Sequence, residues 1–234
     1  MNYFAHGRHF IDDPYFLAGT AVPDWLNVVD RRVRVRSQQA EPFVTADDPC
    51  LARVAAGIVQ HCRDDAWFHA TRAFAELSLS LCAMLRDRLP ADEGFRPHFL
   101  GHILVEILLD AALIADEPAR LAEYYAAFDG LDGQAVERAV NRMSRRPTHQ
   151  LGKLIPLFSR ERFLSDYADD GKLLFRLNQV MRRVRLPLLP AELAPWFGTA
   201  RRMVAERKGE LLAAPHRELP VGQSASTINP NDET

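Results

Sequence analysis

Apolar residues recur at helical spacing along almost the whole chain, and strictly alternating stretches are scarce. Apolar positions three and four residues apart form one face of a helix, whereas alternation is typical of a strand. The strongest helical segments span residues 48–70, 71–88 and 96–115. The first of these opens with "DDP", in which an aspartate can cap the helix. The pattern therefore predicts an all-α protein.

The rest of the chain is predicted to form shorter helices joined by turns. Helices are expected at about residues 2–10, 117–128, 132–145, 159–168, 171–184 and 198–213, and "PYFLAGTAVPDWL" is expected to be a helix that runs into a loop. "RRVRVRS" at residues 31–37 is the only strand-like stretch. We expect one multi-helix bundle domain over residues 1–216. Residues 217–234 are polar and rich in Ser, Asn and Asp, which is typical of a disordered tail.

Composition narrows the function classes only a little. The chain has 234 residues, of which 47% are hydrophobic and 26% charged, as in an ordinary soluble globular protein. A net charge of -2 gives no strong signal for nucleic-acid or membrane binding. The three cysteines form no CxxC pair and the N-terminus lacks a signal-peptide pattern, so we expect a cytoplasmic protein. The apolar run "ILVEILLDAALIA" contains two acids, and no membrane span is predicted.

Two apolar segments carry histidines and acids at four-residue steps. In "GIVQHCRDDAWFHA", His61, Asp65 and His69 share one face, because four residues advance a helix by slightly more than one turn. A solvated face would also explain this stripe, since Arg63 and Asp64 indicate that part of the helix meets water.

The second stripe has almost entirely aliphatic neighbours. "FLGHILVEILLDAALIA" places His102, Glu106 and Asp110 at four-residue steps. A helix that is hydrophobic all round is buried, and an ionised carboxylate there is costly unless it is paired or binds a metal. A hydrogen-bonded core histidine at His102 and a solvent-facing edge at Asp110 are the alternatives.

The N-terminal region supplies further candidates. His6 lies in an aromatic-rich segment, and Asp24 follows Pro23. Because a proline disfavours helix at the preceding residue, we expect Asp24 to lie at a turn with its carboxylate pointing inward. The predicted metal ligands are His6, Asp24, His61, Asp65, His69, His102 and Glu106. These donors suit a divalent transition metal (Zn²⁺, Mn²⁺ or Fe²⁺), and they exceed the four ligands of one tetrahedral site, so we expect a centre of two or more ions.

The ordered set "AHGRHF", "LAGTAVPDW", "AGIVQHCRDDAWFH" and "GHILVE" resembles the all-α zinc-dependent phospholipase C and S1/P1 nuclease group. The resemblance covers about residues 3–110 and implies a zinc cluster held by the seven ligands just named. The chain departs from the group at residues 25–60, which contain no counterpart of a further His ligand. It also shows no signal peptide, whose removal would expose an N-terminal ligand. These departures favour two metals over three.

The chain is also similar to acyl carrier protein phosphodiesterase, an HD-like all-α hydrolase. "MNYFAH", "GTAVPD", "AGIVQHCRDD", "VEILLDAAL" and "VNRMSRRP" carry this similarity over about residues 1–147. The chain departs from that family at His69, where an acid is expected, and at His102. Both resemblances imply a metal-dependent phosphoric ester hydrolase, and they differ in the substrate.

The sequence thus leads to a phosphodiesterase hypothesis, in which a metal-bound hydroxide attacks a phosphodiester. His6, Asp24, His61 and Asp65 are expected to form one ligand set, and His69, His102 and Glu106 a second. Asp110 is expected to orient a ligand histidine or to act as a general base. The rival is a non-catalytic helical protein, either a metal-binding or an interaction protein, in which the stripes are buried hydrogen-bond networks.

A basic segment supplies the candidates for substrate binding. Arg31, Arg32 and Arg34 could bind the phosphate of a substrate or an acidic partner such as acyl carrier protein, because guanidinium forks match phosphate. A solvated basic edge is the alternative.

Overall fold

The computed structural model describes residues 1–91 and 93–213, and within them it contains helices and no strand. The predicted all-α fold class is therefore confirmed. The predicted tail at residues 217–234 lies outside the described residues.

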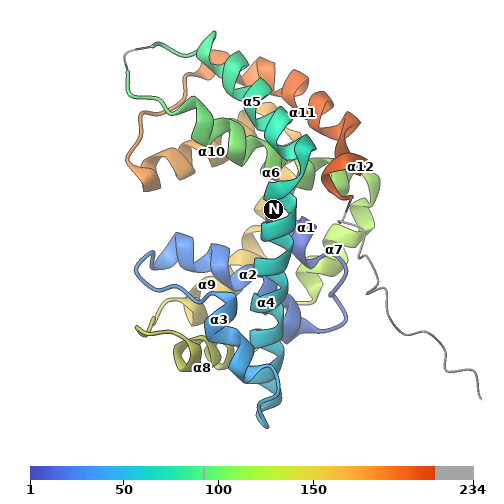
Figure 1. The fold of residues 1–234 in the computed structure, drawn as a ribbon, viewed down its shortest axis with the longest axis vertical. Coiled ribbons are helices and arrows are strands. Elements are labelled where there is room, and N and C mark those ends of the chain that lie inside the picture. Colours follow the sequence, from blue (N-terminus) through green and yellow to red (C-terminus); the bar gives the residue numbers. More distant parts are fainter. Residues whose placement is uncertain (92, 214–234) are drawn as a thin grey trace, which may run out of the picture.

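Four long helices form the framework: α2 (Pro14–Val29), α4 (Pro49–Ala70), α5 (Arg72–Arg86) and α6 (Pro97–Asp116). Figure 1 shows α4 running along the long axis of the molecule, with α2, α3, α8 and α9 around one half and α5, α6, α10 and α11 in the other. The Asp48 carboxylate caps α4 by accepting hydrogen bonds from the backbone N–H groups of Cys50 and Leu51, as "DDP" predicted. The hydroxyl of Thr71 caps α5.

Shorter helices complete the fold. They are α1 (Tyr3–Gly7), α3 (Ser37–Ala40), η1 (Glu41–Phe43), α7 (Pro118–Ala126), α8 (Gly133–Met143), α9 (Leu151–Glu161), η2 (Phe163–Ala168), α10 (Asp170–Val184), η3 (Ala191–Trp196), α11 (Phe197–Glu206) and α12 (Lys208–Leu211). The sequence pattern missed most of α9, which continues through Pro156 although a proline lacks the N–H of a regular helical hydrogen bond. It placed one helix at 159–168, where α9 ends and η2 follows.

The strand-like stretch at residues 31–37 is not a strand. Its alternation is nevertheless real, because Val33 and Val35 are buried in the core while Arg31, Arg32 and Arg34 are exposed. A strand needs a neighbouring strand for its backbone hydrogen bonds, and the described residues offer none. The segment therefore remains an irregular connection between α2 and α3.

The expected turn at Asp24 is wrong, because α2 continues through Pro23 to Val29. Proline lacks the N–H that would bond to the carbonyl group one turn earlier. Tight packing of α2 on α4 outweighs this local loss: a Cβ atom on Gly57 would lie 2.1 Å from the Phe16 carbonyl oxygen and 2.8 Å from the Cα atom of Gly19. Asp24 therefore reaches the protein interior from a helix.

By length and composition α6 could cross a membrane, which the interrupted apolar run had not suggested. However, 61% of its most apolar window is buried inside the protein. A core helix of this kind passes the same test, so α6 is only weak evidence for a membrane span.

The α2–α4 contact gives a test of the fold. Gly57→Ala should lower the free energy of unfolding by about 2–3 kcal/mol, because its methyl group would meet backbone atoms that cannot move aside. The melting temperature, measured by circular dichroism, should fall by about 5–10 °C. Gly198→Ala, in α11, is the matched control, since its methyl group would meet no atom within 4 Å and should leave stability unchanged or slightly higher. Equal melting temperatures for the two variants would contradict this packing.

Candidate metal centre

A first group of donors is formed by His6 of α1 and by His61 and Asp65 of α4. One donor atom from each lies within 4.8 Å of the others. The His6 Nε2 atom is 3.2 Å from Asp65 Oδ1, and the His61 Nε2 atom is 3.4 Å from Asp65 Oδ2. The two imidazole rings stack with their centroids 4.0 Å apart, and both histidines are buried. Three predicted ligands thus converge on one point.

The second nitrogen of His61 is held by α2. Its Nδ1 atom lies 2.8 Å from the carbonyl oxygen of Thr20. A carbonyl oxygen can only accept a hydrogen bond, so Nδ1 carries the proton and donates. Nε2 is therefore the nitrogen that faces Asp65, and it is the one available to bind a metal once it carries no proton.

Asp64 holds His6 in a similar way. Its Oδ2 atom is 3.3 Å from Nδ1 of His6, and its Oδ1 atom accepts hydrogen bonds from Gln60 Nε2 and Trp67 Nε1. The interpretation of Asp64 as a water-facing residue is therefore incomplete, since its side chain is only 14% exposed. Nothing in the sequence around Asp64 indicated that α1 would pack against this residue.

A second group contains His69 of α4 with His102 and Glu106 of α6. Glu106 Oε1 lies 2.8 Å from His69 Nε2 and 3.1 Å from His102 Nε2, and the three donors could hold a metal ion. The side chain of His102 is 46% exposed and that of His69 is 32% exposed. This group is therefore more open to solvent than the first group, in which both histidines are buried and Asp65 is partly exposed.

The N-terminal ammonium group joins the two groups. The Met1 nitrogen lies 2.6 Å from Asp65 Oδ1 and 3.7 Å from Glu106 Oε1, and Met1 is buried. Burial alone would lower the pKa of this amine, but Glu106 and Asp65 outweigh burial and raise the pKa. A positive charge therefore occupies the space between the two carboxylates, so the groups adjoin.

The site keeps both carboxylates ionised at neutral pH. Burial would raise the pKa of Asp65, but hydrogen bonds from His6 and His61 and the nearby ammonium group lower it far below its usual range. The same competition lowers the pKa of Glu106 to about 2, with the ammonium, His102 and His69 outweighing burial. Burial also disfavours a charged His6, yet Asp64 and Asp65 raise its pKa to about 9. The imidazole N–H groups and the Met1 ammonium group stabilise the two carboxylates. A metal cation that binds here would replace these positive charges.

Asp24, the remaining predicted ligand, lies next to the first group but outside its three donors. Burial raises the pKa of Asp24, and His61 and His6 oppose the rise. The buried Oδ2 atom of Asp24 has no hydrogen-bond partner among the described residues. An unsatisfied buried polar atom is costly, and a cation ligated by Asp24 would remove that cost. The donor set therefore fits a divalent metal.

Asp110 is completely buried, and its role is structural in this geometry. Its two carboxylate oxygens accept hydrogen bonds from the backbone N–H groups of Phe4 and Ala5, at 2.9 and 2.8 Å. These groups belong to the first turn of α1, so Asp110 fixes the helix that carries His6. Burial raises the pKa of Asp110 to about 7, although both backbone hydrogen bonds oppose the rise. Of the two roles expected for this residue, the geometry favours orienting a ligand histidine over acting as a general base.

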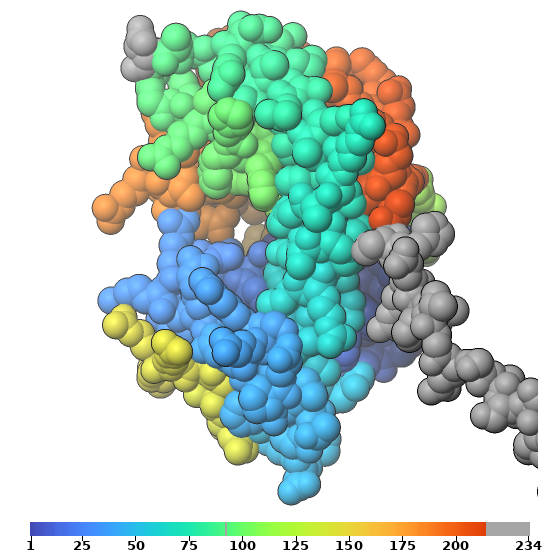
Figure 2. Space-filling model, in the orientation of Figure 1, coloured from blue at the N-terminus to red at the C-terminus, as the bar shows by residue number. Residues whose placement is uncertain are grey.

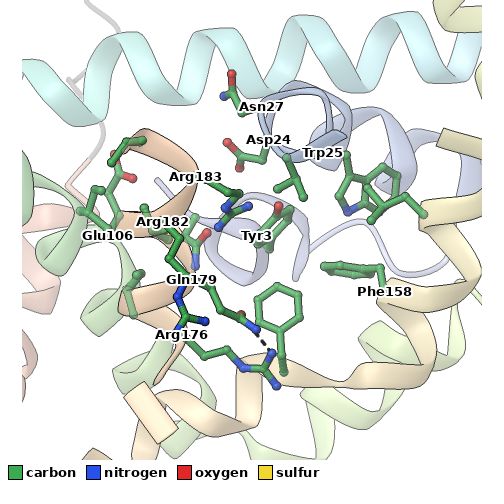
Figure 3. Close-up of a pocket in the computed structure, with 18 of the residues that line it drawn as sticks. Tyr3, Asp24, Trp25, Asn27, Glu106, Phe158, Arg176, Gln179, Arg182 and Arg183 are labelled. Carbon is green, nitrogen blue, oxygen red and sulfur yellow. Dashed lines mark hydrogen bonds between the residues drawn. The ribbon is translucent and has the colours of Figure 1, made fainter. Parts of the chain in front are cut away.

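A pocket of about 750 Å³ opens beside the two groups (Figure 3). Asp24 and Glu106 line it, and Tyr3, Trp25 and Phe158 give it an aromatic wall. In the space-filling view the molecule is hollowed on one face between α10, drawn in orange, and the blue N-terminal segments (Figure 2). The candidate metal centre therefore has a neighbouring cavity large enough for a small-molecule ligand.

Two of the three predicted substrate-binding arginines line this pocket, namely Arg31 and Arg34. Arg32 does not, since its side chain is 82% exposed and lies 3.7 Å from Asp30. The sequence reading missed the α10 side of the pocket, whose polar residues are Arg176, Gln179, Arg182 and Arg183. The sequence shows Arg182 and Arg183 as a basic pair in "MRRV". Their position in the chain gave no indication that they would lie near the histidines of α4 and α6.

Comparisons with protein-family models, with curated proteins and with solved structures gave no match to this chain. The two family resemblances stay predictions, and function is inferred from the residues of the site.

Metal stoichiometry tests the grouping of the donors. Protein saturated with Zn²⁺ or Mn²⁺ and then desalted should hold two ions per chain by elemental analysis. His61→Ala and His102→Ala should each reduce the content to about one ion, because each removes a ligand from a different group. His149→Ala is the control, because the His149 side chain is 80% exposed and lies outside both groups. Less than one ion in the parent protein, unchanged by His61→Ala, would contradict the metal centre.

Proposed function

We propose that this chain is a metal-dependent phosphodiesterase that uses two divalent transition metal ions. The observation that carries the proposal is the junction of two His/carboxylate groups around one cation position, beside a pocket that contains arginines. When bound, such a pair of ions supplies a nucleophile at neutral pH and neutralises charge on the phosphoryl group.

Other residues of the chain would orient the metal ligands and line the substrate pocket. Asp64 and the Thr20 carbonyl group fix the rings of His6 and His61, so that both Nε2 atoms point towards Asp65. Asp110 keeps α1 in place. The aromatic wall of the pocket excludes water and packs against the apolar part of a substrate.

His69 favours the phospholipase C and nuclease pattern over the acyl carrier protein phosphodiesterase pattern. The latter has an acid at this position, whereas here the imidazole lies with His102 and Glu106 as a candidate ligand. This contact supports the resemblance to the phospholipase C and nuclease group, and it does not identify the substrate. Release of phosphopantetheine from holo acyl carrier protein would instead support the second family.

The alternative function, a non-catalytic protein whose histidines and acids form a stabilising network, predicts a different state of the buried polar atoms. A buried network that exists only for stability would have its polar atoms satisfied by protein groups. The unpartnered Oδ2 atom of Asp24, a residue that lines the pocket, argues for a site that takes up a further group.

Proton release on metal binding tests the electrostatics of the first group. The pKa of His6, raised to about 9, means that its imidazole is protonated at pH 7 without metal. Metal binding therefore has to displace this proton, and affinity should rise as pH increases from 6 towards about 9. Calorimetric titrations with Zn²⁺ in buffers of different ionisation enthalpy should show at least one proton released at pH 7. Buffer-independent heats would contradict a metal site at His6.

Hydrolysis of bis(p-nitrophenyl) phosphate tests catalysis. The Mn²⁺- or Zn²⁺-loaded protein should release p-nitrophenol, and a chelator should abolish the reaction until metal is restored. Asp65→Asn and Glu106→Gln should each lower kcat/KM at least about 100-fold, because each weakens a ligand group. His149→Ala should retain full activity. A metal-loaded protein with no turnover would support the non-catalytic alternative, whereas full activity with the chelator present would exclude a metal mechanism.

A further inference from the structure

The pocket contains four arginines without an acidic partner. Arg31 and Arg34 come from the segment after α2, and Arg182 and Arg183 from the last turn of α10; these four are called the arginine cluster. Among the described residues none of them forms an ion pair with an acid, and the only hydrogen bond from a cluster side chain runs from Arg31 Nε to the Asn27 carbonyl oxygen. Arg176, the fifth arginine of the pocket, differs because its Nη2 atom lies 2.6 Å from Asp166.

The positive charges in the cluster disfavour one another. Desolvation at the pocket wall and the nearby charge of Arg31 lower the pKa of Arg183, although all four side chains stay in contact with solvent. Like charges gathered on one pocket are unfavourable until an anion lies between them. The cluster therefore has the electrostatic character of an anion-binding site.

The cluster adjoins the candidate metal centre but contains none of its ligands. Burial raises the pKa of the Tyr3 hydroxyl group, the negative charge of Asp24 adds to the rise, and the positive charge of Arg183 opposes it. Tyr3 therefore lies near both residues. Figure 3 shows Tyr3 in the pocket with Asp24 and Arg183 near it. Two bound metal ions would already neutralise the single charge of a phosphodiester, which leaves four guanidinium groups available for another anion.

We propose that the arginine cluster is a second anion subsite, so that the substrate is a phosphodiester carrying another phosphate across an apolar spacer. The spacer packs on the wall formed by Tyr3, Trp25 and Phe158. A volume of about 750 Å³ is in the range for a ligand of this size. The inference rests on the proposed function only in placing the first phosphate at the metal centre.

Equilibrium binding of unreactive bisphosphates tests the subsite. A series of α,ω-alkanediyl bisphosphates with four to ten carbons is compared with alkyl monophosphates of the same length, by calorimetry on the Mn²⁺-loaded protein. At the best spacer length the bisphosphate should bind at least about tenfold more tightly, since its second phosphate forms charge-assisted hydrogen bonds with the cluster that the monophosphate lacks. Equal affinities at every length would overturn the subsite.

Variants assign the effect to the cluster. Arg182→Gln and Arg183→Gln should each reduce the advantage of the bisphosphate to less than about threefold while leaving monophosphate binding unchanged. Arg145→Gln, an exposed arginine outside the pocket, should preserve the full advantage. Variants that weaken both ligands equally would place these arginines on the first phosphate and overturn the second subsite. These measurements need no turnover, so their failure is distinguishable from a failure to hydrolyse bis(p-nitrophenyl) phosphate.

Discussion

The structure of the site depends on the compensation of two carboxylates, Asp65 and Glu106, inside a helical core. A buried anion is tolerated only where cations or hydrogen-bond donors surround it. Two imidazoles surround each carboxylate, and the Met1 ammonium group lies between the two carboxylates. This need for positive charge explains why histidines gather at the site, and a metal cation meets the same need more completely.

The other features of the fold place these charges. Close packing at Gly19 and Gly57 brings α2 against α4, so that the Thr20 carbonyl group can orient His61. Asp110 attaches α1 to α6 and so brings His6 to Asp65. The histidines of the first group are buried, those of the second are partly exposed, and both groups adjoin the arginine-lined pocket through Asp24 and Glu106. A ligand in this pocket would therefore lie beside both groups.

Sequence reasoning could identify what lies within a single helix. His61 with Asp65 and His102 with Glu106 are four residues apart, and helical geometry alone brings each pair together. The pairing of His69 with the second helix was also predicted. The turn at Asp24 was predicted wrongly, because a local rule for Pro23 was overruled by packing between two helices. Asp64, Arg182 and Arg183 could not be assigned, because their roles depend on how distant segments meet.

The most direct measurement of the central claim is anomalous diffraction from crystals of the protein soaked with Zn²⁺ or Mn²⁺. Two anomalous peaks are predicted, one beside His6, His61 and Asp65 and the other beside His69, His102 and Glu106, with the Met1 ammonium group displaced from its position between the carboxylates. Absence of anomalous density at both groups in metal-soaked crystals, with the ammonium group still paired to Asp65, would contradict the account.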